Sequence, residues 1–129
     1  MRKIKILIVD DEHDFVELIK IRLRKWGYSV IAAYNGKDAL DSLEMKPDII
    51  ILDCYMPKMD GITALEKIRK TDKKTPVIIL TAYPDIDMMN NAQKLGIIAF
   101  IPKITIEVNL RALLEGAARL IKPRKNNLL

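Results

Sequence analysis

Acidic and other polar side chains follow four short apolar runs of this 129-residue sequence. Asp10 and Asp11 come after "ILIV", Asp53 after "IIIL", Thr81 after "VIIL" and Lys103 after "AFIP". Three carboxylates brought to one place would repel one another unless a cation lay among them. A hard divalent ion with oxygen ligands removes that cost. Mg²⁺ is the expected cofactor, with Mn²⁺ as a substitute.

A magnesium ion held by a few carboxylates keeps positions open for water and for phosphate oxygens. Thr81 as a hydrogen-bond donor and Lys103 as a point charge would serve phosphoryl oxygens that the metal does not cover. Asp53 is the candidate nucleophile, because a carboxylate can accept a phosphoryl group. The pattern therefore predicts phosphoryl chemistry that works by position and charge and needs no histidine base.

Each of these residues also has an ordinary structural explanation. Asp10 or Asp11 could cap the following helix, Thr81 could cap the next turn, and Lys103 could be a surface lysine. We favour the functional interpretation because the structural ones must all hold jointly, with each residue just past a different strand. His13, the single histidine, is expected to be an exposed first-turn residue of a helix.

The apolar runs predict the elements that position these side chains. Five runs rich in Ile and Val are too short for helices, at 4–9, 28–33, 49–52, 77–80 and 97–101. Helical spacing fills the intervals, around 15–26, 39–43, 64–68, 88–95 and 110–121. Right-handed crossovers then give a single doubly wound (βα)5 α/β sandwich with a five-stranded parallel sheet. Ligands of such sheets bind beyond the carboxyl ends of the strands, where the polar residues gather.

Composition limits the other possibilities. A chain of this length with 50% hydrophobic residues can form one core, and Cys54 as the only cysteine excludes an intrachain disulfide. No run has the length of a membrane span or a signal sequence, so we expect a cytoplasmic protein. The net charge of +5 is spread over helix faces without a nucleic-acid motif, so direct nucleic-acid binding is not expected.

The sequence resembles the receiver domains of two-component response regulators. The resemblance runs from "KILIVDDE" through "YNGKDAL", "PDIIILDCYMPKMDGITALEKIR", "TPVIILTAY" and "GIIAFIPK" to the last helix. The 28 residues from Asp53 to Thr81 and the 22 from Thr81 to Lys103 fit the family. The resemblance implies a chemotaxis-regulator-like fold of flavodoxin-like topology. It also implies a receiver domain at 1–122, with 123–129 as a C-terminal tail or the start of a linker.

The resemblance further implies a role for each acid. Asp53 would take a phosphoryl group from the phosphohistidine of a histidine kinase or phosphotransfer protein. Asp11 would bind Mg²⁺ directly and Asp10 through water, with Asp53 and the main-chain carbonyl of Tyr55 as further ligands.

Other residues would report the phosphorylation. Thr81 would bond the phosphoryl group, Lys103 would pair with it, and Phe100 falls at the position of the family's switch aromatic. The surface of the fourth helix, fifth strand and fifth helix would then change for an output protein or a fused effector domain. A homodimer through the last helical face is compatible with the family.

Two departures from the family stand out. Ile104 follows Lys103 where the family usually has a proline after a cis peptide bond. We expect a trans bond, because a cis bond to a residue other than proline costs about 3 kcal/mol. Tyr55 and Tyr83 are bulky at positions that tune water access, and our hypothesis is that they lengthen the phosphoryl lifetime.

Two alternative functions stay open beside this signalling switch. One is a receiver-like scaffold that binds partners without phosphorylation. The other, disfavoured, is a phosphohydrolase working through an aspartyl phosphate. Such enzymes need a general acid two residues after the nucleophile, where Tyr55 stands.

Overall fold

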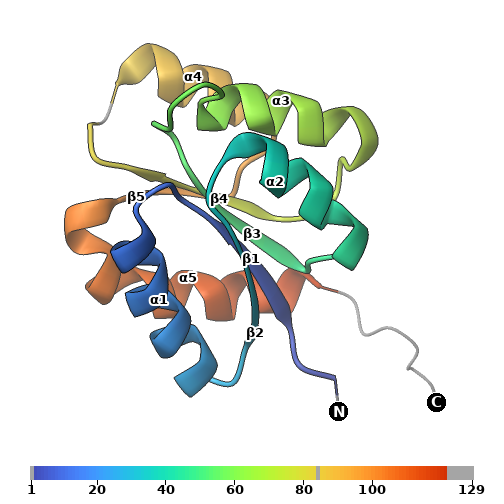
Figure 1. Cartoon of the computed structure of the whole chain (residues 1–129), viewed down its shortest axis with the longest axis vertical. Helices are drawn as coiled ribbons and strands as arrows, with labels where there is room; N and C mark the ends of the chain where they lie inside the picture. Colours follow the sequence, from blue (N-terminus) through green and yellow to red (C-terminus); the bar gives the residue numbers. More distant parts are fainter. Residues whose placement is uncertain (1, 84, 122–129) are drawn as a thin grey trace.

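Strands and helices alternate along the chain in a computed structural model that describes residues 2–83 and 85–121 (Figure 1). The five strands form one sheet of order β2-β1-β3-β4-β5, and every neighbouring pair is parallel. Their bounds are β1 (Lys5–Val9), β2 (Ser29–Ala33), β3 (Ile49–Asp53), β4 (Val77–Thr81) and β5 (Ala99–Pro102). The predicted doubly wound parallel sheet is therefore confirmed.

Helices cover both faces of the sheet. They are α1 (His13–Lys25), α2 (Gly36–Ser42), α3 (Gly61–Thr71), α4 (Ile86–Lys94) and α5 (Ile106–Leu120), with 3-10 turns η1 (Leu43–Met45) and η2 (Lys103–Thr105). Helices α1 and α5 pack on one face, and α2, α3 and α4 pack on the other (Figure 1). None of the helices in the described part of the chain is both long and apolar enough to cross a membrane.

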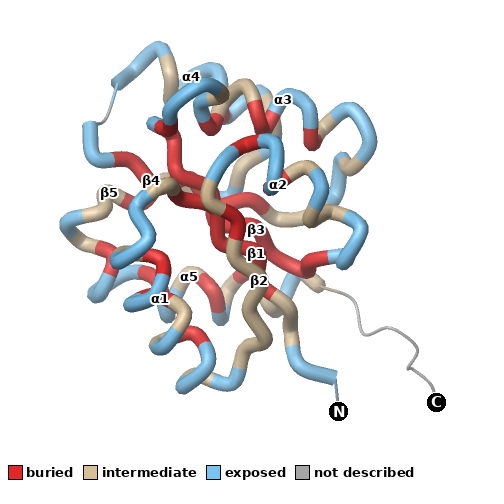
Figure 2. The backbone as a smooth tube through the Cα atoms, in the orientation of Figure 1, coloured by how far each residue is buried: buried red, intermediate tan, exposed pale blue. Residues whose placement is uncertain are grey.

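The two faces explain why the strands are almost continuously apolar. In β1, Ile6 and Ile8 point to the α1 and α5 side, while Leu7 and Val9 point to the other side. Both sets are fully buried, and Figure 2 shows the central strands as the buried middle of the molecule. Strands β3 and β4 are likewise buried at every position, so alternation with polar residues in the central strands would place polar groups in a core.

Local signals fix where the helices begin and end. The side chains of Asn35, Asp60 and Asp85 each accept a hydrogen bond from the backbone N–H three residues further on, at the starts of α2, α3 and α4. Gly27 and Gly96 follow α1 and α4 with φ values of 98° and 79°, which favour glycine. The turn at Gly96 delays β5, which begins at residue 99 rather than at 97 as the apolar run predicted.

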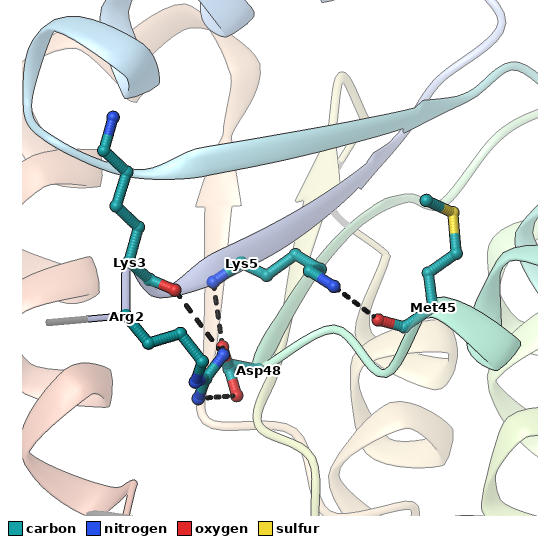
Figure 3. Close-up of polar contacts among 5 residues, drawn as sticks. All are labelled: Arg2, Lys3, Lys5, Met45 and Asp48. Atoms are coloured by element: carbon teal, nitrogen blue, oxygen red, sulfur yellow. Dashed lines mark hydrogen bonds and ion pairs between the residues drawn. The ribbon is translucent and has the colours of Figure 1, made fainter.

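The buried carboxylate of Asp48 joins the amino ends of β1 and β3 (Figure 3). It lies at the opposite end of these strands from the polar residues Asp10 and Asp53. Arg2 donates two hydrogen bonds to Asp48, at 2.9 and 3.1 Å, and the backbone N–H of Lys5 donates a third at 2.8 Å. The ammonium of Lys5 bonds the carbonyl of Met45 at 2.8 Å. These contacts hold the start of the two central strands.

Helix α4 is held less firmly than the other helices. Ala92 is its one buried residue, whereas α3 buries four. Its carboxyl end is fixed by Arg69 of α3, which donates to the carbonyl oxygens of Leu95 at 2.7 Å and Gly96 at 3.2 Å. The attachment of α4 thus depends on one capping guanidinium and a thin apolar contact.

Candidate functional site

Three acids converge where β1 and β3 end. Asp10 follows β1 directly and Asp53 is the last residue of β3, and these strands are neighbours in the sheet. One carboxylate oxygen from each of Asp10, Asp11 and Asp53 lies within 4.8 Å of the others. Asp10 and Asp53 are buried and Asp11 is half-buried. The sheet order thus brings together acids that are 43 residues apart in the sequence.

The surroundings of the three acids make it unfavourable for all three carboxyl groups to be ionised at once. Burial, and after it the charge of Asp10, raises the pKa of Asp53 to about 6, although Lys103 and the backbone N–H of Tyr55 act in the opposite direction. Burial also raises the pKa of Asp10. Three oxygen donors with unfavourable mutual repulsion are the donor set that a hard divalent cation stabilises. The residues present therefore fit Mg²⁺.

Lys103, in η2 just after β5, reaches into this acidic cluster. Its Nζ lies 2.8 Å from Asp10 Oδ2, 2.7 Å from Glu12 Oε1 and 3.5 Å from Asp53 Oδ2. Burial alone would lower the pKa of Lys103, but the bonds to Asp10 and Glu12 outweigh it and raise that pKa. The lysine therefore stays charged and places a cation next to Asp53.

Thr81 ends β4 and is buried beside the cluster. Its hydroxyl accepts a hydrogen bond of 3.1 Å from the backbone N–H of Tyr83, which is the turn contact that the structural explanation predicted. The neighbouring strand places it near the site as well, because Asp53 pairs with Leu80 in the sheet. Thr81 thus has a structural role in addition to its place at the edge.

Two tyrosines bridge the loops after β3 and β4. The Tyr55 hydroxyl donates to the carbonyl of Tyr83 at 3.0 Å, and the rings lie edge to face with centroids 6.2 Å apart. Both rings are open to solvent, with exposed fractions of 43% for Tyr55 and 74% for Tyr83. Phe100 lies apart from them in β5, where it is half-buried and packs against the core beneath α2, α3 and α4.

The loop after β3 depends on a glycine at the start of α3. The Gly61 N–H donates to the carbonyl of Cys54 at 2.9 Å. A side chain at this position would overlap the carbonyl oxygen of Asp53 and lie 2.9 Å from its carbonyl carbon. The start of α3 can therefore lie against Asp53 only when residue 61 is glycine.

Two smaller expectations about this edge are confirmed. His13 is an exposed first-turn residue of α1, and its ring stacks on Tyr34 with centroids 4.0 Å apart. No residue in the described ranges has a cis peptide bond, so the bond between Lys103 and Ile104 is trans.

Comparison with known proteins gives consistent results. Residues 6–115 match the family model of the response regulator receiver domain. Sporulation initiation phosphotransferase F of Bacillus subtilis (strain 168) is 39% identical over 100 residues, which are 77% of this chain and 81% of that protein. Transcriptional regulatory protein ZraR of Escherichia coli (strain K12) is 36% identical over 115 residues, 88% of this chain. The match covers 26% of ZraR, so the chain spans about a quarter of that relative.

Solved structures share the fold. The CheY-like receiver domain protein from Methanospirillum hungatei JF-1 superposes with a TM-score of 0.81 at 29% identity, over 92% of this chain and 93% of that one. Response regulator TrrA from Thermotoga maritima, in complex with Mg(2+)-BeF, has a TM-score of 0.76 at 32% identity, over 93% of this chain and all of that one. From its sheet order, its acidic edge and these similarities, the chain belongs to the receiver domains of two-component response regulators, which are signalling switches rather than classical enzymes.

Proposed function

We propose that this receiver domain is switched by phosphorylation of Asp53. The observation that supports the proposal most directly is the cluster of Asp10, Asp11 and Asp53 with the Lys103 ammonium 3.5 Å from the Asp53 carboxylate. A nucleophilic carboxylate, a cation site and a fixed positive charge are the groups that phosphoryl transfer to an acid requires.

The phosphoryl donor would be the phosphohistidine of a histidine kinase or phosphotransfer protein. An oxygen of Asp53 forms a bond to phosphorus while the bond between phosphorus and the imidazole nitrogen breaks. The nitrogen keeps the electron pair and takes up a proton from water, and Asp53 becomes an acyl phosphate. Attack by water on phosphorus later releases inorganic phosphate and restores the carboxylate.

Asp10, Asp11, Asp53 and the main-chain carbonyl of Tyr55 would hold Mg²⁺, or Mn²⁺ in its place. When bound, the ion supplies positive charge to the phosphoryl oxygens and relieves the repulsion among the acids. The complex of TrrA with Mg(2+)-BeF supports this assignment, because that protein is 32% identical to this chain.

The signal would pass through Thr81 and Phe100. Bonding of the Thr81 hydroxyl to the phosphoryl group changes its contact with the Tyr83 N–H and draws the loop after β4 towards Asp53. Phe100 then turns inward, and the surface of α4, β5 and α5 changes for an output protein, a fused effector domain or a second copy of the chain. We assign this domain to residues 1–122. The tail or linker at 123–129 lies outside the described residues.

Tyr55 and Tyr83 would tune how long the phosphoryl group lasts. Their contact joins the two loops beside Asp53, and we infer that the paired rings limit the approach of water to phosphorus. Replacing both by serine should speed the loss of the phosphoryl group. An unchanged dephosphorylation rate would contradict this assignment.

Mass spectrometry tests the proposal. Incubation with acetyl phosphate and Mg²⁺ should give one phosphoryl adduct, which Asp53→Asn and chelation of the metal both abolish. Asp41→Asn, which neutralises an exposed acid on α2, is the matched control and should keep the adduct. No adduct on the parent chain would support the scaffold alternative, and an adduct retained in Asp53→Asn would place the phosphoacceptor elsewhere. Continuous release of phosphate from phosphomonoesters would support the phosphohydrolase.

A further inference from the structure

The Lys103 ammonium is held by side chains from the beginning of α1. Its Nζ lies 2.7 Å from Glu12 Oε1, at the N-cap of α1, and 4.9 Å from the centroid of the Phe15 ring in the first turn. The Lys103 side chain is only 15% exposed, whereas that of Glu12 is 63% exposed. Glu12 therefore contacts the ammonium from the solvent side, and Phe15 covers it with an aromatic face.

Three carboxylates surround this ammonium, which can donate three hydrogen bonds. Glu12 and Asp10 lie at 2.7 and 2.8 Å, and Asp53 is the most distant at 3.5 Å. The lysine therefore does not reach its place beside Asp53 through contact with Asp53 alone. Its position is set mainly by the two nearer acids.

Glu12 and Asp10 differ in one respect that matters for phosphorylation. Asp10 belongs to the three acids that lie close enough to share a cation, and Glu12 does not. A cation bound at that cluster would partly neutralise the charge of Asp10. The ion pair between Asp10 and Lys103 would then be weaker. Glu12 would keep its contact with Lys103, and its backbone is anchored beside the cluster because its N–H donates to Asp10 Oδ1 at 2.9 Å.

We propose that Glu12 and Phe15 are positioning residues that hold the Lys103 ammonium beside Asp53 while a divalent cation occupies the acids. This inference rests on the proposed role of Asp53 as phosphoacceptor. A lysine side chain without such contacts samples many rotamers, and ordering it anew in each reaction would slow phosphoryl transfer. Glu12 and Phe15 lower that cost by ordering the side chain in advance.

Chemical labelling tests the contact without phosphorylation. Brief acetylation of the metal-free protein by acetic anhydride, with peptide mass spectrometry, compares Lys103 with the exposed Lys37 in the same sample. Lys103 should react more slowly than Lys37, and Glu12→Gln should raise its reactivity about two- to fivefold, the range that one partly exposed ion pair allows. Asp14→Asn removes a neighbouring exposed acid of the same helix turn and should have no effect.

Phosphorylation kinetics test the function of the contact. With acetyl phosphate and Mg²⁺, Glu12→Gln should lower the rate of adduct formation about two- to fivefold. Phe15→Leu, which keeps an apolar side chain but removes the ring face, should lower it by a similar factor of about two to five. Neither change should slow the reaction further in a Lys103→Ala background, because both residues act through the lysine.

The outcomes separate the possibilities. The proposal is overturned if Glu12→Gln changes neither the labelling nor the rate, or if it slows the reaction equally in the Lys103→Ala background. An effect of Glu12→Gln without one of Phe15→Leu would remove Phe15 from the proposal. If the parent chain takes no phosphoryl group, the proposed function fails, and the labelling result still decides whether Glu12 holds Lys103.

Discussion

Replacing Asp53 by asparagine should stabilise the metal-free protein, even though it removes the proposed phosphoacceptor. Asp53 is 2% exposed, and burial together with the charge of Asp10 raises its pKa from 3.8 to about 6. Because the higher pKa belongs to the folded chain, the ionised carboxylate opposes folding. The opposition is complete above pH 6 and disappears as the pH falls towards 3.8. Above neutral pH, the raised pKa of Asp53 corresponds to a loss of about 3 kcal/mol in the free energy of unfolding.

Urea unfolding in the presence of a chelator measures this effect. At about pH 7.5, Asp53→Asn should raise the free energy of unfolding by up to about 3 kcal/mol. At about pH 5 the gain should be about half as large, because the parent carboxyl is then largely protonated when folded. Excess Mg²⁺ should reduce the difference in the free energy of unfolding between Asp53→Asn and the parent chain, because Mg²⁺ that binds the folded parent chain stabilises that chain.

An exposed acid provides the control for this prediction. Asp41→Asn on α2 should change the free energy of unfolding by no more than about 0.5 kcal/mol at either pH. If Asp53→Asn lowered the stability at the higher pH, or raised it equally at both, then the repulsion inferred from burial and from Asp10 would be absent. The fit of the acidic cluster to a divalent cation would lose its physical basis.

Four further substitutions test separate features. Gly61→Ala should cost at least about 2 kcal/mol in thermal unfolding and abolish phosphorylation, because the new methyl group overlaps the phosphoacceptor's carbonyl oxygen. Gly116→Ala in α5, where the nearest atom is 3.8 Å away, should instead stabilise by up to about 1 kcal/mol. Lys46→Gly should stabilise by about 1 kcal/mol because residue 46 has φ 55°, and a lower melting temperature would contradict this. Arg2→Ala should lower the free energy of unfolding by about 1 to 3 kcal/mol, because the buried Asp48 loses two hydrogen bonds, and additivity with Asp48→Asn would refute their coupling.

The sheet and its acidic edge could be predicted because they depend on short-range patterns and a topological rule. Each apolar run became a strand whose bounds differ from the prediction by two residues at most. Parallel strands end at the same edge, so Asp10 and Asp53 had to approach one another once β1 and β3 were neighbours. The two-residue delay of β5 came from the turn after Gly96, which extends past the start of the apolar run.

The contacts made by side chains across loops could not be predicted in the same way. Which of several acids holds Lys103 depends on the path of the backbone after β5 and on the lysine rotamer, and nothing in the sequence distinguishes Glu12 from Asp14. The Tyr55 bond to Tyr83 joins two loops whose relative position follows only from packing. Gly61 could be assigned to a turn, but its close approach to Asp53 depends on how α3 docks.

The weak attachment of α4 affects how much interaction energy a phosphoryl group must supply to switch this domain. A phosphoryl group can shift an equilibrium only by the difference in its interaction energy with the two arrangements. An element that buries a single alanine and is capped by one guanidinium costs little to displace, so a modest energy input can repopulate its states. We therefore expect the amides of α4 to exchange with deuterium faster than those of α3 in the unphosphorylated protein. The rigid sheet thus keeps the reacting groups in position, and the small energy needed to displace α4 makes the conformation of the domain sensitive to phosphorylation.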